Sequence, residues 1–220
     1  HGGSVTPGPY RFDDLVGDWL ALMDHEGVER AVLCGLSMGG MTAMRLAMKA
    51  PDRVRALVVI DSSAARETWF RRVKYKVLAT MFARRGMTDG LLARVAPIMF
   101  GSTTLAERPE LVDALAEMVR ACDREQLAHA IRAVNGRGPI GDISTIEAPT
   151  LVLVGAEDAA TPPFRSHFIH EQIRGSTLIT IPEAGHLSVL ERPDFVARHV
   201  IEFVARLGTE AAPLDAASQA

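Results

Sequence analysis

The sequence predicts an α/β fold in which a mostly parallel sheet carries helices on both faces. Four short apolar runs alternate with segments whose apolar residues recur at helical spacing. The runs are almost continuous in valine, leucine and isoleucine, which is typical of parallel strands buried on both faces. A long stretch without any strand-like run separates the second strand from the third, which predicts a helical insertion.

The N-terminal quarter predicts two strands, each preceded by a helix. Residues 12–26 have the apolar spacing of an amphipathic helix, and the run 31–34 is short and apolar enough for a buried strand. Residues 38–49 predict a second helix, which stops before Pro51 because proline disfavours helical geometry in the residue before it. The second strand is expected over 56–60.

The insertion is expected over residues 64–135, as a helical cap on the core. Its helical patterns are interrupted at glycines and prolines, namely Gly86, Pro97, Gly101 and Pro109. A glycine-rich loop over 136–147 follows. The remaining elements are expected as a strand at 150–154, a helix at 164–173, a strand at 177–181 and a helix at 193–206.

The predicted organisation is therefore a core of residues 1–63 and 136–207, a cap of residues 64–135 and a disordered tail over 208–220. The tail is rich in alanine, proline and serine, a composition that cannot form a packed core. A chain of 220 residues suits one large domain, or a core with a small insertion.

Composition argues against several classes of partner. The net charge is −3 with both signs interspersed, and aromatic residues make up only 5%, so a nucleic-acid surface is not expected. No run of eighteen apolar residues occurs, so we expect no membrane partner. Cys34 and Cys122 are expected as free, buried thiols, which suits a cytoplasmic location. No residues show metal-ligand spacing, and neither a metal nor another cofactor is expected.

The segment Gly35-Leu36-Ser37-Met38-Gly39 matches the G-x-S-x-G pattern between a predicted strand and a predicted helix. A sharp turn there presents the serine at its apex, and flanking glycines avoid side-chain clashes. The helix N-terminus directs free N–H groups at the reacting centre, so the Met38 N–H is expected to donate to a developing oxyanion. Ser37 is therefore the candidate nucleophile, although a glycine-rich turn with an incidental serine would look similar.

A serine nucleophile needs a base, and the base needs an orienting acid, in the chain order serine, acid, histidine. Asp158 follows the third strand and is the preferred acid. Asp61, at the end of the second strand, and Glu157 are the alternatives, and each of the three could instead cap a turn. His186 follows the fourth strand after Gly185 and is the preferred base. The other candidate histidines fall in predicted helices, namely His25, His129, His167, His170 and His199.

Together these segments resemble the α/β-hydrolase family over nearly the whole chain. The resemblance is carried by the elbow around Ser37, by the segments at 51–54 and 149–158, and by Gly185-His186 followed by Glu191-Arg192-Pro193. It implies a serine hydrolase with the triad Ser37, Asp158 and His186. The family often carries G-H-G-x-S after an early strand, and the opening residues 1–4 match its last four positions.

That match implies that the first strands of the sheet, with a second oxyanion donor, are missing. We then expect the strand at 31–34 to lie at a sheet edge, where an apolar strand is an aggregation hazard. We also expect the chain by itself to be a poor catalyst.

Within the family the chain is most similar to 3-oxoadipate enol-lactonases. The similar segments are Cys34 to Met41 at the elbow, residues 159–163 after the acid, and His186-Leu187-Ser188 at the base. Trp69 matches a cap tryptophan and is the candidate pocket residue. Asn135-Gly136-Arg137-Gly138 departs from the pattern expected of those enzymes.

The resemblance implies hydrolysis of a small ester or lactone through an acyl-enzyme on Ser37. A serine at the elbow argues against dehalogenase and epoxide hydrolase chemistry, which needs an aspartate there. Carbon–carbon bond hydrolases and cofactor-free perhydrolases use the same triad and stay open. A catalytically silent binding module is the alternative of another class.

Overall fold

The computed structural model describes residues 4–209 and places four strands in one parallel sheet, in the order β1-β2-β3-β4. The strands are β1 (Ala31–Leu36), β2 (Val54–Ile60), β3 (Thr150–Gly155) and β4 (Thr177–Ile181). The predicted α/β fold is confirmed. Residues 1–3 and 210–220 lie outside the described residues. Of the tail predicted over 208–220, only residues 208 and 209 are described, and both belong to the last helix.

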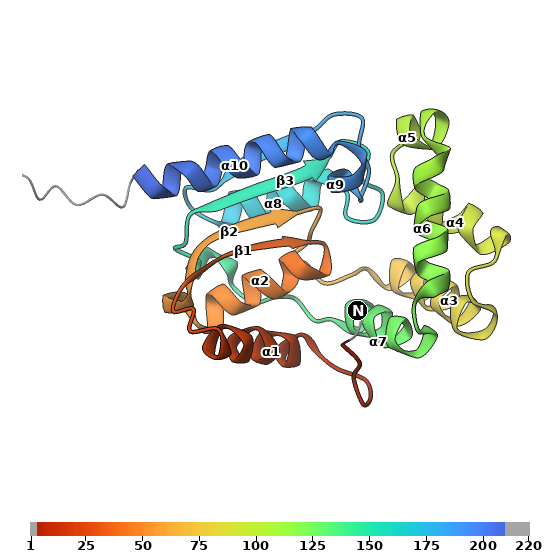
Figure 1. Cartoon of the computed structure of the whole chain (residues 1–220), viewed down its shortest axis with the longest axis horizontal. Helices are drawn as coiled ribbons and strands as arrows, with labels where there is room; N and C mark the ends of the chain where they lie inside the picture. The colour runs from red at the N-terminus through yellow and green to blue at the C-terminus, as the bar shows by residue number, and fades with distance from the viewer. Residues whose placement is uncertain (1–3, 210–220) are drawn as a thin grey trace, which may run out of the picture.

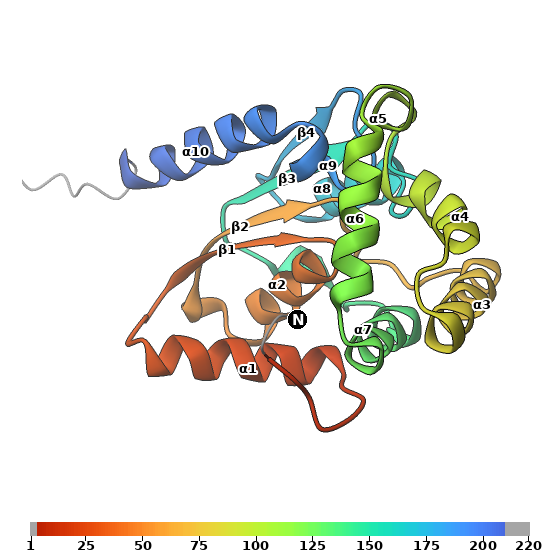
Figure 2. The same cartoon turned by 45° about the vertical axis from the view of Figure 1, so that its right-hand side comes forward.

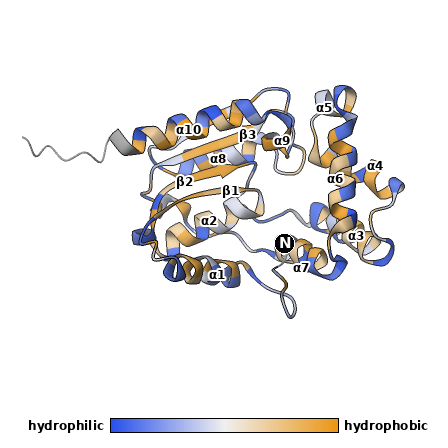
Figure 3. Ribbon diagram, in the orientation of Figure 1, coloured by the Kyte–Doolittle hydropathy of each residue, from blue (hydrophilic) through white to orange (hydrophobic). Residues whose placement is uncertain are grey.

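Helices cover both faces of the sheet, as Figures 1 and 2 show. One face packs against α1 (Phe12–His25), α2 (Met38–Lys49) and α8 (Pro163–Gln172), and the other packs against α10 (Pro193–Thr209). Short helices complete the core, namely η1 (Pro51–Arg53), η2 (Ile143–Thr145) and α9 (Ser188–Glu191). Figure 3 shows the strands as mostly hydrophobic ribbons between helices of mixed character, which is the pattern of a sheet buried on both faces.

β1 lies at one edge of the described sheet, as the sequence predicted. The prediction that both thiols are buried is wrong for Cys34, which is exposed, while Cys122 is half-buried. Cys34 sits on the edge strand β1, where no further strand within the described residues covers it. Both cysteines are free.

Five α-helices lie between β2 and β3 and form the segment that we call the helical insertion, residues 69–136. They are α3 (Trp69–Arg85), α4 (Asp89–Met99), α5 (Ser102–Glu107), α6 (Pro109–Ala121) and α7 (Arg124–Gly136). The sequence predicted a helix break at Pro97, and this prediction is wrong. Pro97 lies inside α4, two residues before the end of the helix. Figure 1 shows the insertion beyond the carboxyl ends of the strands, where β1 leads into α2.

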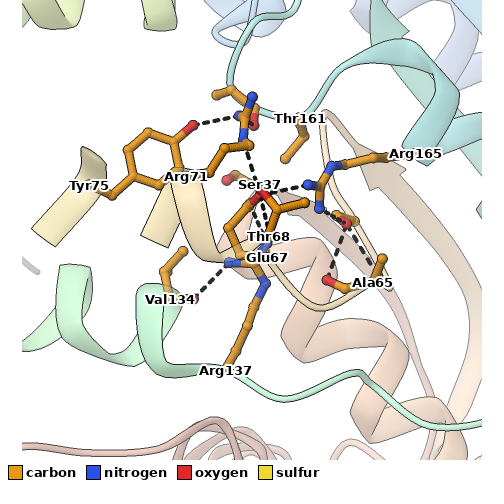
Figure 4. Close-up of polar contacts among 12 residues, drawn as sticks. Ser37, Ala65, Glu67, Thr68, Arg71, Tyr75, Val134, Arg137, Thr161 and Arg165 are labelled. Carbon is orange, nitrogen blue, oxygen red and sulfur yellow. Dashed lines mark hydrogen bonds and ion pairs between the residues drawn. The ribbon is translucent and has the colours of Figure 1, made fainter. Parts of the chain in front are cut away.

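A buried ion cluster ties the insertion to the core, and we call Glu67, Arg71, Arg137 and Arg165 the Glu67 cluster (Figure 4). Glu67 precedes α3, Arg71 lies on α3, Arg137 follows α7 and Arg165 lies on α8. Glu67 Oε1 lies 2.6 Å from Arg165 Nη2 and 3.0 Å from Arg71 Nε, and Oε2 lies 3.2 Å from Arg137 Nη2. The cluster therefore links the core to the two points at which the chain enters and leaves the insertion.

We predict that Glu67→Ala lowers the free energy of unfolding by about 3–5 kcal/mol, because it leaves buried arginines without their shared carboxylate. Glu67, Arg137 and Arg165 are all buried. Chemical denaturation measures the change. Glu110→Ala is the matched control, since Glu110 pairs with Arg108 at an exposed site and its loss should cost under about 1 kcal/mol. Equal stability losses in the two variants would contradict the prediction.

Candidate active site

Ser37 forms the turn between β1 and α2 with a backbone conformation that only a few non-glycine residues adopt. Its φ is 50° and its ψ is −110°. The Ser37 N–H donates to the Ile60 carbonyl at 2.8 Å, and the Ser37 carbonyl accepts from Ser62 Oγ at 2.7 Å. It also accepts from the Met41 N–H at 3.0 Å. Hydrogen bonds on both sides of the residue thus hold the strained turn in place.

Two glycines are required around this turn, and only one of them belongs to the five-residue pattern. A Cβ on Gly35 would lie 2.3 Å from the Gly39 carbonyl carbon, and a Cβ on Gly40 would lie 2.8 Å from Ser62 Oγ. A Cβ on Gly39 would meet no atom within 4 Å. The close packing of the turn therefore explains why glycine occupies positions 35 and 40, whereas position 39 has room for a side chain.

The structure brings Ser37, His186 and Asp158 into one chain of hydrogen-bonding distances. His186 Nε2 lies 2.9 Å from Ser37 Oγ, and His186 Nδ1 lies 2.9 Å from Asp158 Oδ2. With the ring proton on Nδ1, the histidine donates to the carboxylate and its free Nε2 accepts the serine proton. Asp158 and His186 are both buried. This arrangement can remove a proton from the serine hydroxyl.

Asp158 is held by the turn that follows β3. Its Oδ1 accepts from the N–H groups of Ala160 and Thr161, each at 2.8 Å. Its Oδ2 accepts from Thr161 Oγ1 at 2.8 Å, in addition to its contact with His186. Since these donors occupy both oxygens, the carboxylate has one orientation and presents Oδ2 to the imidazole.

The loop that carries His186 packs against the insertion at a backbone-to-backbone contact. A Cβ on Gly185 would lie 2.4 Å from the Gly101 nitrogen, so only glycine permits this approach. The buried carboxylate of Glu191 bridges the two segments, because it accepts from the Gly185 N–H and from the Gly101 N–H, each at 2.8 Å. The insertion thereby helps to fix the position of the imidazole.

The two alternative acids have other partners. Asp61 is fully buried and accepts from the Gly155 N–H at 2.8 Å, and its Oδ2 lies 2.5 Å from Ser188 Oγ. Burial raises the pKa of Asp61 to about 7, although the hydrogen bonds from Ser188 and Gly155 oppose the shift. Glu157 accepts from the N–H and hydroxyl groups of Ser102 at the start of α5. Each of these carboxylates therefore joins neighbouring segments and makes no hydrogen bond with the imidazole.

The remaining candidate histidines all lie on helices. His129 contacts Arg132 and Glu125 on its own helix, and His170 Nδ1 lies 2.8 Å from Ser176 Oγ. The five remaining candidates lie on α1, α7, α8 and α10, namely His25, His129, His167, His170 and His199. His186 is the histidine that the structure brings to Ser37.

A cavity of about 500 Å³ lies between the core and the insertion and opens onto Ser37, Met38 and His186. Met38 is the first residue of α2, where the helix itself offers no acceptor for the backbone N–H. Trp69 is absent from the lining and is 66% exposed, so the structure does not bring it to the pocket. It lies on the outer side of α3, and Tyr75 and Phe82 from the same helix line the cavity instead.

Apolar side chains from the insertion form most of the cavity wall. They come from α3, α4, α6 and α7 and include Leu78, Phe82, Leu91, Val95, Leu115, Val119, Leu127, Ile131 and Val134. Polar groups gather near the nucleophile, where Glu67, Arg137 and Thr161 contribute to the lining. The cavity thus offers a hydrocarbon-lined chamber with polar groups at the reactive end.

Sequence reasoning missed the Glu67 cluster and Glu191. Glu67 pairs with Arg137 and Arg165, which lie 70 and 98 residues further along the chain, and no local pattern predicts such pairings. A weak signal existed for Glu191, which stands five residues after His186 in the segment that carried the family resemblance. Arg137 stood in a segment noted only as a departure from the expected pattern.

Within residues 4–209, no group of three or more histidine, cysteine, aspartate or glutamate side chains lies close enough to hold a metal ion. None of the helices in this part of the chain is both long and apolar enough to span a membrane.

Comparison with known proteins gives a family match over most of the chain. The model of the alpha/beta hydrolase family matches residues 1–199. The chain is 32% identical over 208 residues to 3-oxoadipate enol-lactonase 2 of Acinetobacter baylyi, an alignment that covers 93% of this chain and 74% of that protein.

Two solved structures are similar in both fold and sequence. The enol-lactonase of Burkholderia xenovorans superposes with a TM-score of 0.83 at 30% identity, over 93% of this chain and 77% of that one. A thermophilic esterase of Thermogutta terrifontis, solved with malate bound, superposes with a TM-score of 0.84 at 29% identity, over 93% and 75% of the two chains.

The raised pKa of Asp61 predicts a pH-dependent loss of stability that Asp61→Asn removes. The folded protein keeps the Asp61 proton up to about pH 7, whereas the unfolded chain loses it near pH 4. Raising the pH through this window therefore lowers the free energy of unfolding, on the order of 4 kcal/mol in total. Asparagine mimics the protonated carboxyl and does not titrate.

Urea denaturation of both proteins between pH 4.5 and 7.5 measures this effect. The stability of Asp61→Asn relative to the parent protein should rise with pH across the range. A difference between the two proteins that stays constant with pH would show that Asp61 is ionised in the fold throughout.

Proposed function

Since the chain belongs to the alpha/beta hydrolase family, we propose that it hydrolyses an ester or lactone through an acyl-enzyme formed on Ser37. It is a hydrolase that acts on ester bonds, in keeping with relatives that are enol-lactonases and esterases. The observation that carries the proposal is the chain of two 2.9 Å contacts from Ser37 through His186 to Asp158, at the floor of the cavity.

The reaction begins with proton transfer from Ser37 Oγ to His186 Nε2 as the oxygen attacks the substrate carbonyl. Negative charge develops on the carbonyl oxygen, and the Met38 N–H at the start of α2 is positioned to donate to it. The helix dipole adds to this stabilisation. Collapse of the intermediate breaks the ester bond, and the imidazolium gives its proton to the departing alkoxide.

Water then hydrolyses the acyl-enzyme, and His186 again acts first as base and then as acid. His186 Nε2 takes a proton from the water as it attacks the acyl carbonyl, and returns that proton to Ser37 Oγ. Asp158 holds the Nδ1 proton throughout, which keeps Nε2 free to act as base and stabilises the imidazolium when it forms.

The cavity favours a substrate whose body is mostly hydrocarbon. Its walls are aliphatic and aromatic over most of their extent, and its polar groups gather at the end that holds Ser37. The similarity to 3-oxoadipate enol-lactonase supports a lactone, and the similarity to the Thermogutta esterase supports an open ester. We propose a small ester or lactone with an apolar body as the substrate class.

A fluorophosphonate probe tests the proposal, because it reacts with a serine only when a neighbouring base activates it. Mass spectrometry of the labelled protein should find the adduct on Ser37. Labelling should vanish in Ser37→Ala and fall by at least about 10³-fold in His186→Ala.

His25→Ala is the matched control, since His25 is an exposed histidine at the end of α1, and its labelling should equal that of the parent protein. A folded parent protein that resists the probe would overturn the enzymatic role and favour a silent binding module.

Replacing each carboxylate in turn distinguishes Asp158 from Glu157 as the acid. Asp158→Asn should lower kcat on a chromogenic ester by about 10⁴-fold, because asparagine favours the wrong tautomer of the imidazole. Glu157→Gln should lower it by no more than about tenfold, since Glu157 bonds to the start of α5 instead. The assignment of Asp158 fails if the two variants have similar rates.

A further inference from the structure

Helix α3 concentrates positive charge in a chain whose net charge is −3. Its 17 residues contain six cationic side chains and no acidic one, namely Arg71, Arg72, Lys74, Lys76, Arg84 and Arg85. Arg71 pairs with Glu67 in the buried cluster. Within residues 4–209, no ion pair joins the other five to a carboxylate. The helix therefore presents uncompensated positive charge to solvent.

Large apolar side chains are exposed on the same helix, and we call Trp69, Phe70, Val73 and Val77 the outer face of α3. Trp69 and Phe70 are 66% and 68% exposed, and both valines are 53% exposed. The two aromatic rings stack with centroids 3.6 Å apart. Such a contiguous apolar stripe on a protein surface marks a site of interaction.

The outer face lies opposite the side of the helix that lines the cavity. At about 100° per residue, the outer face spans an arc of about 100°. The cavity-lining residues Tyr75, Leu78, Ala79 and Phe82 spread over a similar arc on the far side of the helix. Lys74 and Arg85 border the outer face on one side, and Arg72 and Lys76 border it on the other. From Trp69 to Val77 the outer face is thus an apolar stripe with cationic side chains at its margins, and further along the helix Thr80 and Arg84 continue the same arc.

A cationic groove adjoins this stripe between α3 and α7. Its volume is about 470 Å³, and its wall includes four cationic side chains and no carboxylate, namely Arg72, Lys76, Arg84 and Arg132. Figures 1 and 2 place α3 at the margin of the molecule, far from α10, so the core does not cover this surface.

We propose that the outer face of α3 binds the surface of an anionic lipid membrane, with the helix lying in the plane of the interface. Tryptophan, phenylalanine and valine on one stripe with arginine and lysine beside it supply the two kinds of side chain through which interfacial helices bind anionic lipid. The apolar side chains enter the boundary between headgroups and acyl chains, while the long basic side chains extend to the lipid phosphates. The groove between α3 and α7 receives headgroup phosphates.

A lipid surface explains this helix better than an acidic protein does. Charge complementarity serves both partners, but four large apolar side chains exposed along one stripe need an apolar medium on the other side. The proposal departs from the expectation of no membrane partner, which rested on the lack of an apolar run long enough to span a bilayer. Because α3 also forms a cavity wall, binding would place the hydrocarbon-lined chamber one helix diameter from the lipid.

Vesicle flotation with the whole protein tests the proposal without reference to chemistry at Ser37. The protein should float with vesicles that contain 30% phosphatidylglycerol in phosphatidylcholine, and not with pure phosphatidylcholine. Trp69→Ala combined with Phe70→Ala should weaken binding by about tenfold or more. Trp19→Ala is the matched control, since Trp19 is a half-exposed tryptophan on α1, and it should bind as the parent protein does.

Charge reversal tests the basic margins. Each cation near an anionic surface contributes roughly fivefold to the affinity, so Lys74→Glu combined with Lys76→Glu should weaken binding by about 25-fold or more. Lys49→Glu combined with Arg174→Glu changes the net charge by the same amount at exposed positions outside the insertion, and it should have a much smaller effect. Added salt should weaken the binding of the parent protein.

Fluorescence separates insertion into lipid from attraction by charge alone. Trp19 and Trp69 are the two tryptophans of the chain, so Trp19→Phe leaves Trp69 as the single reporter. Its emission should shift to shorter wavelength with anionic vesicles, and lipids brominated in their acyl chains should quench it. Polyglutamate, an acidic polymer without lipid, should leave the emission wavelength unchanged.

Two outcomes would overturn the proposal. One is binding to polyglutamate as tight as that to anionic vesicles, with no quenching by brominated lipid, which would assign the surface to an acidic protein. The other is flotation that is absent, or equal in the α3 variants and their matched controls. Circular dichroism confirms that each variant is folded, so that loss of binding is not loss of structure.

Discussion

The buried carboxylate of Glu67 is the contact on which the working geometry of this molecule depends. It gathers guanidinium groups from the start and the end of the insertion and from α8 of the core. Burying these charges is costly, and each is tolerated only because its partner is in place. The cavity lies between the core and the insertion, which this cluster joins, so the shape of the space beside Ser37 depends on the cluster.

The insertion also contributes to the positions of the reacting groups. Gly101 touches Gly185 through backbone atoms, and Glu191 accepts a hydrogen bond from each. His186 is therefore held from one side by the carboxylate of Asp158 and through its own loop by the insertion. The helices that line the cavity therefore also restrict the loop that carries His186, so the shape of the cavity and the position of the imidazole depend on the same segment.

Helix α3 has two apolar faces, and its sequence alone does not distinguish the face that lines the cavity from the face that is exposed. The face that includes Phe82 lines the cavity, while the face that includes Trp69 is open to solvent. Resemblance placed Trp69 in the pocket because the residue type and its position early in the insertion matched. The rotation of α3 against the sheet, set by tertiary contacts such as Arg71 with Glu67, decides which face turns inward.

Local features of the sequence determined the strands, the elbow and the candidate triad, because each depends on residues close in the chain. Buried parallel strands are continuous apolar runs, and the groups that follow them meet at one edge of the sheet, which is why Ser37, Asp158 and His186 could be named from their order. Only the tertiary structure decided the partners of Glu67, the exposure of Trp69 and the extent of the cavity. These depend on how helices dock across large sequence separations, and the pairing of one buried carboxylate with arginines 70 and 98 residues away leaves no periodic signal in the chain.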